Sequence, residues 1–121
     1  NDAKVLQAIQ GHPNIVSLIE VIPEGIVETA ESSHGGAQKL HVDYAMAIEC
    51  LRGGELYFNM QKFGRYTPDV AHYYFCQVLD AIGHMHERGY CHRDLKPWNV
   101  MLTDDLANAK VIDFSYSTPL T

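Results

Sequence analysis

The residues best suited to chemistry lie close together in one segment, residues 92–102, with the sequence His-Arg-Asp-Leu-Lys-Pro-Trp-Asn-Val-Met-Leu. Asp94, Lys96 and Asn99 place a carboxylate, an ammonium and a carboxamide within six residues. A carboxylate can serve as a base, an ammonium can neutralise a phosphate, and a carboxamide oxygen can bind a metal ion. Pro97 cannot continue a helix, so we expect the segment to be a loop.

A second acidic motif follows this loop after a short β-like run. Asp113-Phe114-Ser115 begins eleven residues after Leu102. Because Mg²⁺ prefers oxygen ligands, Asp113 could share a metal ion with Asn99. The two motifs therefore predict one site that combines a base, a cation for phosphate and a pair of metal ligands.

In this order and at this spacing, the two motifs resemble the catalytic loop and the Asp-Phe-Gly motif of protein kinases. The resemblance implies transfer of a phosphoryl group from ATP, with Mg²⁺, to a protein substrate. Asp94 would orient the attacking hydroxyl, Lys96 would lie near the transferred phosphate, and Asn99 and Asp113 would bind Mg²⁺. Lys96 resembles Ser/Thr kinases rather than tyrosine kinases. Together with residues 49–56, it places the chain nearest the calcium/calmodulin-dependent kinase group.

Residues 49–56, Glu-Cys-Leu-Arg-Gly-Gly-Glu-Leu, resemble the kinase hinge that receives adenine. The resemblance implies backbone contacts to the base, a gatekeeper behind it and an apolar floor beneath it. Glu55 would accept hydrogen bonds from the ribose, although it could equally be a helix-start carboxylate favoured by the helix dipole. The implied nucleotide-binding residues are Glu49 and Leu51 (backbone), Ile48 (gatekeeper), Glu55 (ribose) and Met101 (floor).

Two residues depart from the kinase pattern. Ser115 replaces the glycine of Asp-Phe-Gly, and its Cβ restricts the backbone, so we expect a biased Asp-Phe conformation with metal binding by Asp113 unaffected. Trp98 stands where many kinases directed to basic substrates carry glutamate. We therefore expect no strong preference for arginine just before the acceptor residue.

The elements that must hold these residues suggest an α+β protein, a partial two-lobe kinase fold. We expect a helix over residues 1–9, strands over 14–22 and 40–48, and a long polar connection over 24–39. A short helix should cover 56–62. The resemblance implies a partial N-lobe at 1–48, a hinge at 49–55 and a partial C-lobe at 56–121.

A long helix should run from Thr67-Pro68-Asp69, which is a hydroxyl cap followed by proline and an acid, to about Arg88, with Gly89 as its stop. Apolar residues recur within it at helical spacing and predict a buried stripe. That stripe would hold the catalytic loop in place. Its members are Val70, Tyr74, Val78, Ile82 and Met85.

Nothing in the 121 residues resembles the glycine-rich phosphate loop, the strand lysine that binds ATP, or the Ala-Pro-Glu motif. We therefore expect a fragment of a longer protein that is inactive alone, within an active Ser/Thr kinase. The alternatives are a pseudokinase that binds partners and a scaffold that only binds Mg²⁺ and nucleotide.

Composition excludes some other classes. The net charge of −6 and the lack of a Lys/Arg run argue against nucleic acid or a membrane as the main partner. The three cysteines form no Cys-x-x-Cys pair, which indicates reduced thiols in a cytoplasmic protein. A metal site at His84, His86, Cys91 and His92 is disfavoured, because helix positions two apart face different directions. The oligomeric state stays open.

Overall fold

The computed structural model describes residues 2–28, 35–42 and 44–120, and it has the expected α+β character. Its helices are α1 (Asp2–Ala8), α2 (Leu56–Phe63), α3 (Pro68–Glu87) and the 3-10 turn η1 (Pro97–Asn99). Its strands are β1 (Leu18–Ile22), β2 (Gly25–Glu28), β3 (Lys39–Val42), β4 (Ala45–Ile48), β5 (Gly54–Glu55), β6 (Tyr90–Cys91), β7 (Val100–Leu102), β8 (Ala109–Val111) and β9 (Thr118–Pro119).

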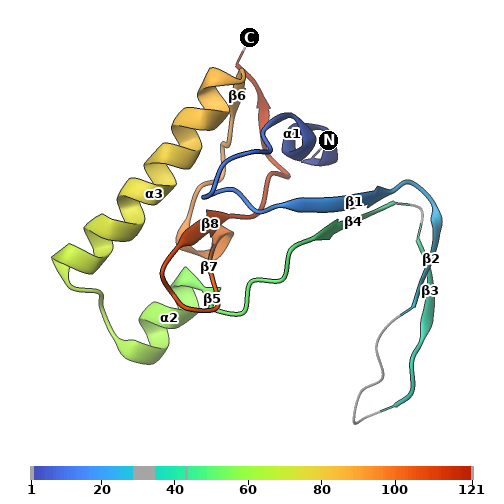
Figure 1. Ribbon diagram of the computed structural model, residues 1–121, viewed down its shortest axis with the longest axis horizontal. Coiled ribbons are helices and arrows are strands. Elements are labelled where there is room, and N and C mark those ends of the chain that lie inside the picture. The colour runs from blue at the N-terminus through green and yellow to red at the C-terminus, as the bar shows by residue number, and fades with distance from the viewer. Residues whose placement is uncertain (1, 29–34, 43, 121) are drawn as a thin grey trace.

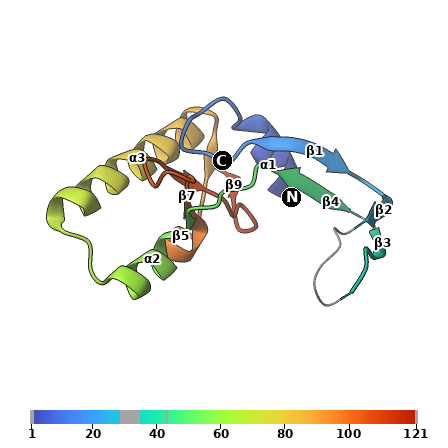
Figure 2. The same cartoon turned by 60° about the horizontal axis from the view of Figure 1, so that its bottom comes forward.

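The helical part and the long β-ribbon lie on opposite sides of the molecule. Figure 1 shows α2 and α3 on one side, while β1 and β4 extend away on the other and continue into the β2–β3 hairpin. Figure 2 shows the same separation after rotation, with β5 and β7 between the two sides. Both sequence motifs lie in this central region.

Helix α3 forms for the reasons that the sequence indicated. Thr67 Oγ1 accepts a hydrogen bond from the N–H of Val70 at 3.3 Å, Pro68 takes the first helical position, and Gly89 has a φ of 84° just beyond the end. Of the expected apolar stripe, Tyr74, Val78 and Met85 are buried and Ile82 is partly buried, whereas Val70 is 39% exposed in the first turn. The residues of α3 that are buried in the core are Tyr74, Val78, Ala81 and Met85.

A three-stranded antiparallel sheet, in the order β5-β7-β8, joins the two motifs. The catalytic-loop segment leads directly into β7, and β8 leads directly to Asp113. Ile112 N–H donates to Asn99 O at 3.0 Å, so the ends of the two strands stay together at the site. The small hairpin is therefore the element that brings residues distant in sequence into one place.

The first expected strand, 14–22, is wrong in its first half, because only β1 is a strand. The side chain of Asn14 is buried and donates to Ala109 O at 2.8 Å and to Gln77 Oε1 at 3.0 Å. Its carbonyl accepts from Val111 N–H at 2.9 Å. These bonds hold the segment against β8 and α3 instead of in a ladder with β4.

The second expected strand, 40–48, is divided between two partners. β3 pairs with β2 and β4 pairs with β1, so the expected connection over 24–39 contains paired strands at both ends. Residues 29–34 of that connection lie outside the described residues. The shorter helices agree with expectation: α1 lies within 1–9, and α2 ends at Phe63 before Gly64, which has a φ of 88°.

Candidate active site

The carboxylate of Asp94 is the centre of a small polar cluster. Asn99, which is 6% exposed, donates from Nδ2 to Asp94 O at 2.8 Å and to Asp94 Oδ2 at 3.3 Å. Lys96 Nζ lies 3.4 Å from the same Oδ2. The acid, the ammonium and the amide are therefore brought together as the spacing predicted.

The backbone of the loop is shaped to present this cluster. Arg93 has a φ of 73°, in the left-handed region that non-glycine residues rarely adopt. The next residue is held by His92 Nδ1, which accepts from Asp94 N–H at 3.1 Å. Asn99 N–H donates to Lys96 O at 2.9 Å and closes the turn η1. The reactive groups thus lie on a fixed turn and not on a free loop.

His92 supports this turn from inside the protein. Its ring is 4% exposed and packs edge-on against Phe114, with 5.4 Å between ring centroids. Burial lowers the pKa of His92, and the backbone and carboxylate of Asp113 and the carboxylate of Asp94 oppose that shift only in part. A neutral imidazole whose Nδ1 accepts a hydrogen bond carries its proton on Nε2.

Asp113 is held by Ser115. Its Oδ1 accepts from Ser115 Oγ at 2.6 Å and from Ser115 N–H at 2.9 Å. The hydroxyl and then the backbone N–H lower the pKa of Asp113; burial opposes them, and the charge of Lys96 adds a smaller effect in the same direction. Among the described residues, Asp113 makes no direct hydrogen bond to Asp94, Lys96 or Asn99. The two segments are joined next to it, because the N–H of Ile112 donates to Asn99 O.

The donors at this site fit Mg²⁺. In the part of the chain that the structure describes, Asn99 Oδ1 and Asp113 Oδ2 accept no hydrogen bond, so both oxygens are free for a hard cation. Mg²⁺ commonly takes one or two protein oxygens and completes its shell with water and phosphate. The roles of Asn99 and Asp113 as metal ligands stay predictions.

The residues weighed as an alternative metal site, His84, His86, Cys91 and His92, lie at the end of α3 and in the segment that follows it. Among the described residues, no group of three or more His, Cys, Asp or Glu is placed to hold a metal ion. His84 Nε2 instead lies 2.7 Å from Ile9 O, and its ring packs on His12 with 4.9 Å between centroids. Cys50, Cys76 and Cys91 are free thiols.

The hinge segment is attached to β8 by an ion pair that the sequence did not reveal. Glu49 Oε1 lies 2.6 Å from Lys110 Nζ and accepts from Ser17 N–H at 2.8 Å. Although burial opposes it, the hydrogen bonds from Lys110 and Ser17 lower the pKa of Glu49. Glu49 N–H donates to Ser17 O at 3.0 Å, so its carbonyl is the backbone group left for a ligand.

The other expected nucleotide-binding residues surround the start of β5. Glu55 pairs with Met101 in the β5–β7 ladder and precedes α2, where its side chain makes no capping hydrogen bond. The carboxylate is therefore available for a ribose, although a dipole effect at the start of α2 is also compatible with this place. Leu51 is buried, whereas Ile48 at the end of β4 is exposed, with 41% of its surface accessible. Their contacts with adenine stay predictions.

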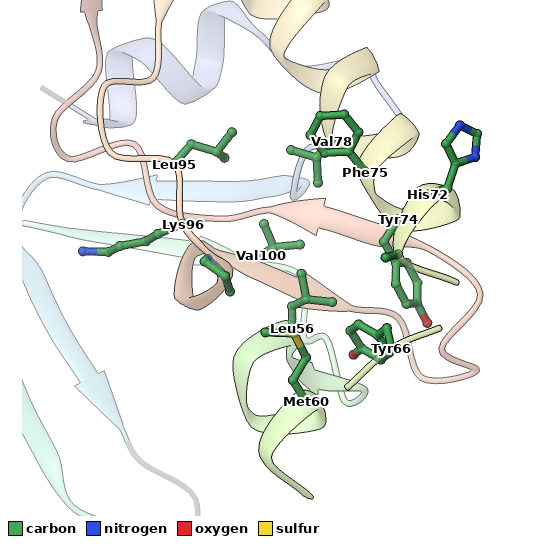
Figure 3. Close-up of a pocket in the computed structure, with 12 residues that line it drawn as sticks. Leu56, Met60, Tyr66, His72, Tyr74, Phe75, Val78, Leu95, Lys96 and Val100 are labelled. Carbon is green, nitrogen blue, oxygen red and sulfur yellow. The ribbon is translucent and has the colours of Figure 1, made fainter. Parts of the chain in front are cut away.

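A cavity of about 470 Å³ lies beside the catalytic loop but is not the phosphate site. Figure 3 shows its largely apolar lining from α2, α3 and the loop, with the ammonium of Lys96 pointing away from the apolar side chains. Asp94, Asn99 and Asp113 do not line it. The labelled lining residues are Leu56, Met60, Tyr66, His72, Tyr74, Phe75, Val78, Leu95, Lys96 and Val100.

Two functional features were missed at the level of the sequence. The Glu49–Lys110 pair joins residues 61 positions apart, and no local pattern signals it. The Ser115 hydroxyl could have been anticipated, because serine two residues after an aspartate is well placed to reach its carboxylate.

Comparison with known proteins agrees with this geometry. The model of the protein kinase domain matches residues 1–121. CBL-interacting protein kinase 24 of Oryza sativa subsp. japonica is 37% identical over 113 residues, which cover 93% of this chain and 21% of the relative. CBL-interacting serine/threonine-protein kinase 15 of Arabidopsis thaliana is 42% identical over 106 residues, covering 88% and 21%.

A third relative is 3-phosphoinositide-dependent protein kinase 1 of Arabidopsis thaliana, 37% identical over 93 residues, which cover 72% of this chain and 19% of the relative. The chain thus spans about a fifth of the length of the curated relatives it matches. None of the helices that the structure describes is long and apolar enough to cross a membrane. The relatives agree with the expected Ser/Thr class nearest the calcium/calmodulin-dependent group. The chain belongs to the protein kinase family.

Proposed function

We propose that the full gene product carrying these residues is a Ser/Thr protein kinase that transfers the γ-phosphoryl group of ATP to a protein hydroxyl. The observation that supports this most strongly is the position of Asp94, whose Oδ2 lies within reach of both Asn99 Nδ2 and Lys96 Nζ. Phosphoryl transfer depends mainly on positioning and charge neutralisation, which this cluster can supply.

Each side chain of the cluster has a separate part. Asp94 orients the substrate hydroxyl and accepts its proton, and Lys96 offsets the negative charge of the phosphate as it moves toward the acceptor. Asn99 and Asp113 hold Mg²⁺, which when bound neutralises phosphate charge. Glu49 and Leu51 contact adenine through the backbone, Ile48 and Met101 enclose it, and Glu55 binds the ribose.

The proposal extends to the substrate side. Residue 98 carries no carboxylate: Trp98 stacks on Tyr57, with 4.6 Å between ring centroids and 7° between planes. Its neighbour Lys96 places an ammonium 5.7 Å from the Trp98 ring. A cationic side chain of the substrate therefore finds no partner acid at this position, so we expect no selection for arginine there.

We also propose a cytoplasmic location for the protein. The free thiols of Cys50, Cys76 and Cys91 support it, because cytoplasmic proteins keep their cysteines reduced.

A pseudokinase, or a scaffold that only binds Mg²⁺ and nucleotide, is the second candidate. The observation that favours it is the Ser115 hydroxyl on Asp113 Oδ1, which occupies one oxygen of an expected metal ligand. Such a protein would bind partners or ATP but would not release ADP or phosphorylate a substrate. The two candidates therefore differ in turnover.

The test is phosphorylation of Ser/Thr peptides by the full-length gene product with MgATP, comparing Asp94→Asn with the unaltered protein. We expect activity to fall by about 10²- to 10⁴-fold, the usual loss on removing a general base, while ATP still binds. Asp80→Asn removes an exposed carboxylate from α3 and serves as the matched control with unchanged activity. An Asp94→Asn variant as active as this control would contradict the proposal, and ATP binding without turnover in the unaltered protein would favour the pseudokinase.

A further inference from the structure

Ser115 contacts the expected metal ligand in a way that the glycine of the family motif could not. Its hydroxyl donates to Asp113 Oδ1 at 2.6 Å, and its own N–H donates to the same oxygen at 2.9 Å. A glycine would retain only the second bond. Both bonds fall on one carboxylate oxygen and leave Asp113 Oδ2 without a partner among the described residues.

The backbone at Ser115 accepts a side chain without strain. Positive φ values at non-glycine residues occur, within the described residues, only at Arg93 and Leu106. The conformational freedom of glycine is therefore not used at this position in this chain. Since Ser115 is also exposed, its side chain is not needed to fill the core.

The turn that carries Ser115 is anchored on both sides. Phe114 is 2% exposed and packs against the ring of His92. Ser117 N–H donates to Phe114 O at 3.0 Å, and Ser117 Oγ donates to His92 O at 3.2 Å. The hydroxyl of Ser115 is consequently presented to Asp113 from a fixed segment.

We propose that Ser115 is a positioning residue for metal binding: its hydroxyl holds Asp113 Oδ1 and leaves Oδ2 as the single oxygen that Asp113 offers to Mg²⁺. The inference rests on the proposed function, because it assumes that Asp113 binds the metal ion. Mg²⁺ requires near-octahedral geometry and suits one well-placed oxygen, whereas Ca²⁺ readily takes both oxygens of a carboxylate. Hydrogen-bond partners of metal ligands commonly control affinity in this manner.

The opposing explanation is that the hydroxyl only stabilises its own turn. In that case its removal would alter stability but not the dependence of ATP binding on Mg²⁺. Binding measurements with and without the metal ion separate the two explanations, and they do not require turnover.

The experiment measures ATP binding to the full-length protein by calorimetry in Mg²⁺, in Ca²⁺ and in EDTA. The variants are Ser115→Ala, which removes the hydroxyl, and Ser115→Thr, which retains a hydroxyl at the same position. Tyr116→Phe is the matched control, because it removes an exposed hydroxyl of the same turn that makes no hydrogen bond among the described residues. Thermal melting of each variant checks that it is folded.

We expect Ser115→Ala to weaken Mg²⁺-dependent ATP binding by about tenfold, at the low end for a partner of a metal ligand. Binding of ATP in EDTA should not change, and binding in Ca²⁺ should weaken less than binding in Mg²⁺. Both Ser115→Thr and Tyr116→Phe should match the unaltered protein. The inference about Ser115 would be overturned, and the proposed function left intact, by either of two results. One is equal ATP affinity of Ser115→Ala and the unaltered protein in Mg²⁺, and the other is an equal loss of ATP affinity in EDTA. Absence of Mg²⁺-dependent binding in the unaltered protein would instead overturn the proposed function.

Discussion

His92 acts as an internal support for the reactive loop and not as a participant in its chemistry. Its Nδ1 holds the N–H of Asp94, and its ring packs on Phe114 next to Asp113. Both motifs therefore depend on one buried imidazole. The charge state of that imidazole should control the stability of the site.

We predict that the protein loses stability as the pH falls below 6.5, the ordinary pKa of histidine, in part because of His92. Burial lowers the pKa of His92 in the folded protein, so the unfolded chain binds the extra proton first, and the free energy of unfolding decreases with acidification. His92→Phe keeps an aromatic ring against Phe114 but cannot titrate. Urea unfolding between about pH 5 and 7.5 should show a shallower pH dependence for this variant.

The same comparison controls for other groups. His12 also has a pKa lowered by burial and by the charge of His84, and it is present in both proteins. The difference between the two pH profiles therefore reports on His92. Parallel profiles would show that His92 does not contribute.

Ser115 shows how far the role of a single residue could be predicted from the sequence. The motif located Asp94, Lys96, Asn99 and Asp113, because their types and spacing carry the chemistry. It suggested that Ser115 would affect the backbone only, whereas the structure shows a direct hydrogen bond to the carboxylate of Asp113. A motif gives the identity of a ligand, but the orientation of its two oxygens depends on neighbours that the motif leaves variable.

At the scale of elements, α3 could be predicted because its signals are local. The Thr67 cap, Pro68 and Gly89 set its limits, and the spacing of apolar residues set its buried face. The strands were predicted less well, because the limits of a strand depend on the segment with which it pairs. Asn14 bonds to β8 and α3 rather than entering a ladder, and this depends on contacts more than sixty residues away.

We predict that the buried face of α3 contributes much of the free energy of unfolding of the part of the molecule that contains the catalytic loop. Met85→Ala should lower the free energy of unfolding by about 2–5 kcal/mol, since Met85 is fully buried and its truncation leaves a cavity. Leu79→Ala is the matched control, because Leu79 is 51% exposed on the same helix and should cost only a small fraction of this. Urea unfolding of both variants measures the difference, and equal costs would contradict the assigned face.

At the scale of the whole molecule, the site joins two regions through a few tertiary bonds. The Glu49–Lys110 pair attaches the hinge segment to β8, and the β7–β8 hairpin attaches the loop to Asp113. Two large apolar side chains that line the cavity, Phe75 and Leu95, are exposed.

We predict that the isolated 121-residue chain has no kinase activity. Its residues include nothing that resembles a glycine-rich phosphate loop or its lysine, and stabilisation of the transition state requires such donors to be in place. A radiometric assay with MgATP and a Ser/Thr peptide should give the same rate for the chain and for its Asp94→Asn variant. A rate above background that Asp94→Asn abolishes would contradict the prediction.

The most direct test of the central claim, that the loop and the Asp113 motif form one Mg²⁺–nucleotide site, is a double-mutant cycle on ATP binding by the full-length protein. Asn99→Ala and Asp113→Asn should each remove most of the gain in affinity that Mg²⁺ provides, and the double variant should lose little more, because both remove ligands of one ion. Independent, additive losses, or a full Mg²⁺ gain retained in either single variant, would contradict the account.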